Sequence, residues 1–224
     1  MIALIIFLLI VALVVNQLKK NVPNTATQKL FTIIRNAAFI GIFIAAIFSS
    51  IAQVGAGEAG VQVLFGSVQD GVLKSGLNFV NPLIDVEKMD VKTQAYTMSS
   101  IRDEGQQSGD DAISSLSMDG LTLKLDVTVW FRLSENDAPQ VYRTIGMDYV
   151  EKIVRPAVRT AIRDVSVGYS ATDIYSIKRE DFVRDITKNL ENAFNGRGII
   201  LERVLLRNVE LPERVREAID EKIA

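Results

Sequence analysis

Residues Leu121–Leu133 read LTLKLDVTVWFRL, a strict alternation of apolar side chains with mostly polar ones. The apolar set comprises Leu121, Leu123, Leu125, Val127, Val129, Phe131 and Leu133. The opposite set comprises Thr122, Lys124, Asp126, Thr128, Trp130 and Arg132. A period of two residues predicts an antiparallel strand that buries one face and exposes the other. Ser114–Met118 and the Asp119-Gly120 turn come just before it, and we expect them to complete a hairpin.

After this strand the apolar period becomes that of helices. Asp137–Ile145 predicts a short helix, and Asp148–Val167 a long one, in which Pro156 should kink the helix or confine its hydrogen bonding to the part beyond. The apolar face of the long helix carries Val150, Ile153, Val154, Ala157, Val158, Ala161, Ile162 and Val165. Ser170–Ile177 predicts a capped turn of helix.

A second long helix is predicted over Arg179–Asn195, closed by Gly196. Gly198–Val209 returns to strand character. Pro212 then stands at a first helical position, where its missing N–H costs nothing. The helix that it starts would place Val215, Ala218, Ile219 and Ile223 on one apolar face.

Before the long strand, the chain predicts short strands over Val61–Val68, Leu77–Val80 and Asp85–Met98. Residues 55–60, GAGEAG, match the spacing G-x-G-x-x-G of dinucleotide-binding loops. That chemistry needs a strand before the motif and a helix after it, whereas here a strand pattern follows. We interpret the glycines as a flexible exit from the preceding apolar segment.

The segment Ser99–Asp111 is polar and carries the acids Asp103, Glu104, Asp110 and Asp111. Carboxylates in a loop can bind calcium, but their spacing differs from that of the EF-hand loop. A solvated loop is the better interpretation, and we predict no metal or cofactor site in the chain.

The head of the chain has two apolar segments: Met1–Val15 has no polar residue, and Ala37–Val54 has no charge. We predict a first membrane segment over residues 1–18 and a transmembrane helix over 37–54, since about 20 helical residues cross the ~30 Å hydrocarbon core. A signal peptide or a re-entrant segment are the alternatives for the first one.

Residues 19–36 are predicted to form a linker whose charges are all basic: Lys19, Lys20, Lys29 and Arg35. Because positive loops stay in the cytoplasm, these four residues place the linker there and the domain from Gly55 onward on the other side.

Composition excludes most enzyme classes. The chain has no Cys and no His, so thiolate nucleophiles, Ser-His-Asp triads and nearly all zinc sites are ruled out. What remains is a Ser-Lys dyad, for which Ser114, Ser115 or Ser117 with Lys124 are weak candidates. Since the whole chain carries −2 and residues 1–54 carry +4, residues 55–224 carry −6. This acidic balance argues against nucleic acid as a partner.

Arg155, Arg159 and Arg163 recur every four residues along the predicted long helix. Like charges at this spacing repel by a few tenths of a kcal/mol per pair unless acids lie opposite. The row is either a solvated ridge or an edge that docks an acidic neighbour such as another copy. Together with Val215, Ile219 and Ile223, it forms our candidate oligomer interface.

This order of elements resembles the stomatin/prohibitin/flotillin/HflK-C (SPFH, band 7) family, with prohibitins the nearest in character. The resemblance covers about 170 residues. It rests on EAGV at 58–61, GVLKSGLNFVNP at 71–82, DGL at 119–121, IGMDY at 145–149, VRPAVR at 154–159, GIILERV at 198–204 and VELPE at 209–213. The additional apolar segment before residue 37 differs from the single anchor of typical prohibitins.

The resemblance implies an α+β fold: N-terminal transmembrane helices, an antiparallel β-rich subdomain over residues 55–134, an α/β subdomain over 135–211, and the start of a long C-terminal coiled-coil helix over 212–224. It also implies a non-enzymatic scaffold that forms a homo-oligomeric ring or cage, organises a membrane microdomain and regulates a membrane AAA+ protease of the FtsH type. The membrane would be a bacterial plasma membrane or the mitochondrial inner membrane. The alternative is a holdase that grips membrane proteins without forming a ring.

Overall fold

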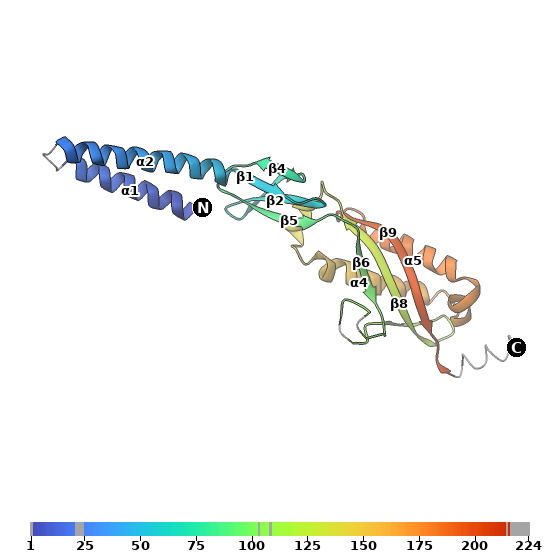
Figure 1. Ribbon diagram of the computed structural model, residues 1–224. Helices are drawn as coiled ribbons and strands as arrows, with labels where there is room; N and C mark the ends of the chain where they lie inside the picture. Colours follow the sequence, from blue (N-terminus) through green and yellow to red (C-terminus); the bar gives the residue numbers. More distant parts are fainter. Residues whose placement is uncertain (1, 21–24, 103, 108, 214, 216–224) are drawn as a thin grey trace. The chain divides into compact units, whose positions relative to one another are not determined.

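The computed structural model describes residues 2–20, 25–102, 104–107, 109–213 and 215. The chain divides into two compact units, Met1–Lys88 and Met89–Ala224. The first unit holds two long helices and a small β-structure, and the second holds a twisted sheet with helices (Figure 1). The α+β class predicted from the sequence is confirmed.

Two apolar helices, α1 (Ile2–Lys20) and α2 (Thr25–Ser49), lie side by side as a hairpin (Figure 1). Small side chains are buried along the hairpin: Ala12, Ala38 and Ala45 are at most 7% exposed. A Cβ added at Gly41 would lie 3.4 Å from Leu8 Cδ1. Such small residues let the two backbones approach closely, which is how helices pack in an apolar medium.

The boundaries predicted for this region are corrected. Helix α2 begins at Thr25, so most of the expected linker 19–36 is helical, and it ends at Ser49 instead of Val54. Residues Ile51–Val54 form strand β1, which pairs with β4 (Gly76–Phe79). Polarity had suggested a linker, but Gln, Lys, Leu and Arg are good helix formers. At the C-terminal end of α2, Ile51–Val54 look like a continuation of the apolar helix, but they form a strand because they pair with β4.

A three-stranded sheet completes the first unit, in the order β3 (Ser67–Leu73), β2 (Glu58–Leu64), β5 (Ile84–Asp90), with β2 and β3 antiparallel. The strand expected over Val61–Val68 is interrupted by a two-residue turn. Its central residues Phe65 and Gly66 have φ of 48° and 84°, as a type I′ hairpin requires.

The glycine-rich segment 55–60 is a turn between two strands, β1 and β2. The Gly55 N–H donates to Glu58 Oε2 at 2.9 Å, and Gly57 adopts a positive φ of 77°. The strand that follows cannot present a helix N-terminus to a pyrophosphate, so the dinucleotide interpretation fails, as expected.

Strand β8 (Thr122–Leu133) is the centre of the sheet in the second unit. Strand β9 (Ile199–Glu210) pairs with it along its length, while β6 (Gln94–Met98) and β7 (Ile113–Leu116) share its other edge. All these pairings are antiparallel. The single strand expected over Asp85–Met98 is broken after Asp90, whose Oδ1 accepts a hydrogen bond from the Lys92 N–H at 2.8 Å and so forms a turn.

The helices of this unit are α3 (Ala138–Thr144), α4 (Arg155–Ser166) and α5 (Arg179–Phe194), with π-helical turns η1 (Val150–Val154) and η2 (Asp173–Ile177). Pro156 stands in the first turn of α4, directly after η1. A proline cannot donate to the preceding turn, so the predicted interruption of the long helix is confirmed.

One face of β8 forms the core with α4 and α5. Its side chains at alternate positions from Leu123 to Leu133 are at most 1% exposed, and the helices bury Val158, Ile162, Phe182, Ile186 and Leu190 to the same extent. The predicted strand face is confirmed. The opposite face is less open than expected, because Asp126 and Thr128 are buried. Asp126 accepts a hydrogen bond from the Ser100 N–H, and Thr128 is hydrogen-bonded to Thr97, its neighbour on strand β6.

Replacing Ile162, which is fully buried, by Ala should lower the free energy of unfolding by about 2–5 kcal/mol, because a cavity remains where the side chain was. The same change at Ile101, which is 58% exposed, should cost less than about 0.5 kcal/mol. Denaturation of the full chain in detergent, followed by the fluorescence of Trp130, compares the two. Equal losses would contradict the core described above.

Candidate functional site

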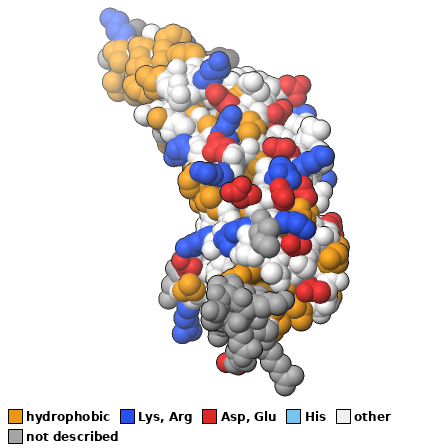
Figure 2. Space-filling view, turned by 90° about the vertical axis from the view of Figure 1, so that its right-hand side faces the viewer, with side chains coloured by type: hydrophobic (Ala, Val, Ile, Leu, Met, Phe, Trp, Pro, Cys, Tyr) orange, Lys and Arg blue, Asp and Glu red, His pale blue; other side chains and the backbone are white. Residues whose placement is uncertain are grey.

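On the side seen in Figure 2, the hairpin of α1 and α2 presents a mostly apolar surface. In the described part of the chain, Thr27–Ser49 is the one helix long and apolar enough to cross a membrane, with a mean hydropathy of 2.1, and Ile6–Leu18 is a shorter apolar helix. Only 11% of the first is buried within the protein. The exposed large side chains include Phe7, Ile10, Leu13, Ile33, Phe39, Ile40, Phe43 and Phe48. Such a surface is stable only in lipid or against another apolar partner.

The basic residues predicted to set topology lie toward the turn of the hairpin. Lys19 and Lys20 are the last residues of α1, and the exposed Lys29 lies in the second turn of α2. Arg35, further along α2, reaches across to α1, where its Nη1 donates to Asn16 Oδ1 at 3.4 Å. Sequence reasoning did not foresee this contact, because it treated residues 19–36 as a linker.

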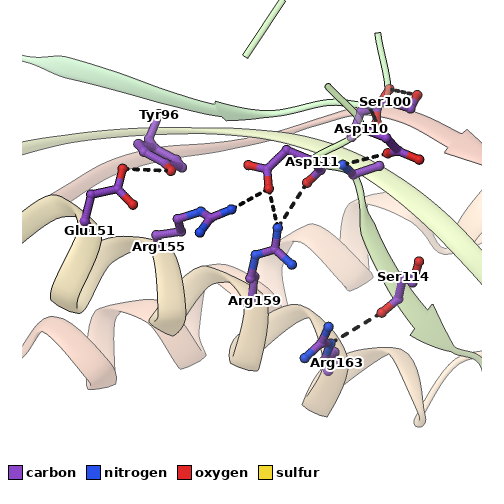
Figure 3. A network of polar contacts seen from close by, with 11 residues as sticks. Tyr96, Ser100, Asp110, Asp111, Ser114, Glu151, Arg155, Arg159 and Arg163 are labelled. Atoms are coloured by element: carbon purple, nitrogen blue, oxygen red, sulfur yellow. Dashed lines mark hydrogen bonds and ion pairs between the residues drawn. The ribbon is translucent and has the colours of Figure 1, made fainter. Parts of the chain in front are cut away.

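A second polar site joins helix α4 to the loop that precedes β7 (Figure 3). Arg155 Nη2 lies 2.5 Å from Asp111 Oδ1, and Arg159 binds the same oxygen. The Asp111 side chain is 7% exposed, while the two arginine side chains are 29% and 27% exposed. The hydrogen bond that Arg155 donates to Asp111 is the main reason why the pKa of Arg155 is raised. We call these three residues the arginine cluster.

Two predictions about this region are corrected by the arginine cluster. Arg155 and Arg159 are not a solvated ridge, because their acidic partner is Asp111 of the same chain. Asp111 itself, expected in a solvated loop, is buried, and its N–H donates to the Ser99 carbonyl at 2.9 Å. The two charges that repel along the helix are thus bridged by a carboxylate, which offsets the like-charge cost.

The strand next to the arginine cluster contributes Tyr96, whose hydroxyl donates to Glu151 Oε1 at 3.2 Å. Burial, more than any neighbouring charge, raises the pKa of Tyr96. The phenol therefore stays neutral at physiological pH and acts as a hydrogen-bond donor that ties β6 to η1.

The surroundings of Lys124 do not suit the base of a Ser-Lys dyad. Lys124 Nζ donates to Asp110 Oδ2 at 2.9 Å, and this hydrogen bond raises the pKa of the lysine. A lysine that activates a serine as a base needs a lowered pKa, whereas the pKa of Lys124 is raised. Ser117 Oγ donates instead to Asp119 Oδ1 at 2.5 Å, and Ser114 lies opposite Lys124 in the register of β7 and β8.

Acidic residues of the loop 99–111 pair with basic side chains. Glu104 binds Arg207, and Ser99 Oγ donates to it at 2.8 Å. Asp103 lies outside the described residues. Among the residues that are described, no three carboxylates gather as a metal site would require.

Arg163 behaves differently from the other two arginines of the row. It is exposed, and the one polar contact found for it among the described residues is from its Nε to the Ser114 carbonyl, at 3.4 Å (Figure 3). It lines a groove of about 370 Å³ between β7 and α4 together with Ser114, Ser115, Leu116, Thr122 and Val167. Leu116 and Val167 are more than half exposed. We call Arg163, Leu116 and Val167 the assembly surface. The alternation in Ser114–Met118 would predict buried Leu116 and Met118, yet the structure exposes both and buries Ser115 and Ser117. The proximity of Leu116 to Val167 comes only from the fold.

The C-terminal part of the candidate interface is described only at its beginning. Val215 is half-buried, whereas Ile219 and Ile223 lie outside the described residues.

Comparison with known proteins agrees with this architecture. Residues 52–224 match the SPFH domain / Band 7 family. The chain therefore belongs to the SPFH (band 7) family. It is 25% identical over 206 residues to a mitochondrial prohibitin-7 of Arabidopsis thaliana, covering 91% of this chain and 69% of the relative. A prohibitin-1 of Saccharomyces cerevisiae is 24% identical, covering 88% and 64%.

A stomatin-1 of Caenorhabditis elegans is 24% identical over 177 residues, covering 79% of this chain and 48% of the relative. The chain thus spans between about half and about two thirds of the length of these relatives. The predicted membership of the family, and the resemblance to prohibitins within it, are confirmed. Members of this family are generally membrane scaffolds and not enzymes.

Replacing Asp111 by Asn should lower the free energy of unfolding by about 2–4 kcal/mol, because two partly buried guanidinium groups lose their shared carboxylate. The matched control is Asp110→Asn, next along the chain, whose ion pair with Lys124 is exposed to solvent and should contribute little to stability. Denaturation in detergent measures both. If the two variants were equally stable, the arginine cluster would not hold the loop to α4.

Proposed function

We propose that this chain is a prohibitin-like scaffold, in which many copies close into a ring or cage on a membrane and so organise a patch of lipid and membrane proteins. The observation that carries the proposal is the match to the SPFH domain over residues 52–224, directly after an apolar hairpin. A domain attached to an anchor moves only in the plane of the bilayer, which raises its effective concentration toward other copies.

The assembly surface supplies a physical basis for contact between copies. Leu116 and Val167 offer apolar area, and Arg163 is a charge without a carboxylate partner among the described residues. The rest of the domain is acidic, with −6 over residues 55–224. A basic, partly apolar groove would therefore bind an acidic surface of the next copy. Such a head-to-tail contact, repeated about an axis, closes a ring.

The similarity to prohibitins supports a further part of the proposal. We propose that the assembled ring regulates a membrane-bound AAA+ protease of the FtsH type by limiting which substrates reach it. We place the chain in a bacterial plasma membrane, with the mitochondrial inner membrane as the alternative. The basic residues toward the hairpin turn would face the cytoplasm, with the SPFH domain on the opposite side.

Assembly through the assembly surface predicts that Val167→Asp, or Arg163→Glu, converts large particles into much smaller species. The cause would be a like charge introduced against an acidic neighbour, which costs several kcal/mol when desolvated. The size of the detergent-extracted full chain, from native electrophoresis or electron microscopy, checks this. Met147→Asp is the control, since Met147 is 50% exposed and lies away from the groove.

If the particles of both variants kept their size, the contact between copies would not involve the assembly surface. A monodisperse monomer of the unaltered chain would contradict the scaffold. If crosslinking then gave adducts with other membrane proteins and few between copies, the holdase alternative would take its place.

The topology can be tested with single cysteines, because the chain has none of its own. We expect Met118→Cys, in the domain, to react with a membrane-impermeant maleimide on intact bacterial spheroplasts. Lys29→Cys, in the hairpin, should react only after permeabilisation. Both side chains are exposed in the structure. Labelling of both on the same side would overturn the proposed orientation.

A further inference from the structure

The hairpin carries a groove with an apolar wall and a cationic end. It has a volume of about 360 Å³ and is lined by Leu9, Ala12, Leu13, Asn16, Arg35 and Phe39. The α1 residues recur at intervals of three and four, so they form one continuous stripe. From Leu9 to Asn16 the stripe runs about 10 Å along the helix at 1.5 Å per residue. Its polar members, Asn16 and Arg35, stand together at one end.

Within the part of the chain that the structure describes, the guanidinium of Arg35 has no carboxylate partner. Its Nη1 and Nη2 donate to the side-chain amide oxygens of Asn16 and Asn36, each at 3.4 Å, which is the weak end of the hydrogen-bond range. The first acidic residue of the sequence is Glu58, so neither helix offers a negative charge. A guanidinium has five N–H donors and binds phosphate through two of them at once. Most of this capacity is therefore free.

Arg35 also lies at a depth where a free cation is costly. The uncharged part of α2 beyond it, residues 36–49, covers about 21 Å, whereas the hydrocarbon core is ~30 Å thick. With the end of α2 at one membrane surface, Arg35 sits below the opposite surface unless the bilayer thins or the side chain extends toward it. A negative headgroup drawn down to the guanidinium removes that cost.

We propose that this groove binds an anionic phospholipid, with its phosphate on Arg35 and Asn16 and the first part of one acyl chain along Leu9, Leu13 and Phe39. The ligand is a lipid and not free phosphate, because the groove that leads away from the guanidinium is apolar and faces the surroundings of a membrane helix. The inference rests on the proposed function, since it requires the hairpin to be inserted. It adds to the proposed scaffold a preference for anionic lipid in the membrane patch that the copies enclose.

The test uses the full chain reconstituted in phosphatidylcholine vesicles with a trace of spin-labelled phosphatidylglycerol or spin-labelled phosphatidylcholine. Electron paramagnetic resonance gives the fraction of each lipid immobilised by the protein. We expect about a fivefold preference for phosphatidylglycerol, as for one basic residue near an anionic lipid. Arg35→Gln should bring the preference close to one, and inorganic phosphate should leave the unaltered chain unchanged.

Lys29→Gln is the matched control, because it removes one positive charge from the same helix but outside the groove. It should keep most of the preference, and Arg35→Lys should keep part of it. If Lys29→Gln lost as much as Arg35→Gln, the attraction would be diffuse and the groove would not be a site. Loss of the preference on addition of inorganic phosphate would likewise overturn a lipid site.

Two further readouts on the same vesicles separate this inference from the scaffold. Resistance to alkaline extraction reports insertion, and particle size after solubilisation reports assembly. A chain that inserts and assembles normally but shows equal affinity for both lipids overturns the lipid site and leaves the scaffold standing. A chain that is extracted by alkali overturns both.

Discussion

The burial of one face of β8 against α4 and α5 is the constraint on which the second unit depends. Its alternate side chains from Leu123 to Leu133 are essentially inaccessible, so the strand cannot slip by one residue without exposing the whole set. Because β6, β7 and β9 all pair with β8, its register fixes theirs. Arg163 and Leu116 come together only because β7 is held at that edge beside α4.

Charge is distributed differently in the two units, and each pattern suits its surroundings. In the second unit, the arginine cluster supplies its own counter-charge, since the buried Asp111 carboxylate bridges two arginines. In the hairpin, by contrast, Arg35 has only neutral amide partners. A membrane can supply anionic headgroups from outside, whereas a protein core must supply its own counter-charge. This contrast is the basis of the lipid site that we propose.

The proposed scaffold and the proposed lipid site fit together in one protein. The hairpin would hold each copy in the membrane and select lipid by charge, while the assembly surface would join copies through apolar area and one cation. Membership of the SPFH family establishes the class of protein. The relatives named as prohibitins and stomatin make a membrane scaffold the natural role. None of these contributions requires a reactive group.

The sequence by itself determined the strand face of β8, the helices α3 to α5, the proline interruption and the family, because local period and turn chemistry carry these features. It misjudged α2, whose polar first half is helical, and the strand β1, which cross-strand pairing creates. Only the tertiary structure decided that Asp111 bridges Arg155 and Arg159 and that Asn16 meets Arg35. Such contacts join residues far apart in the chain, and no local pattern encodes which carboxylate or amide the fold brings to a given arginine.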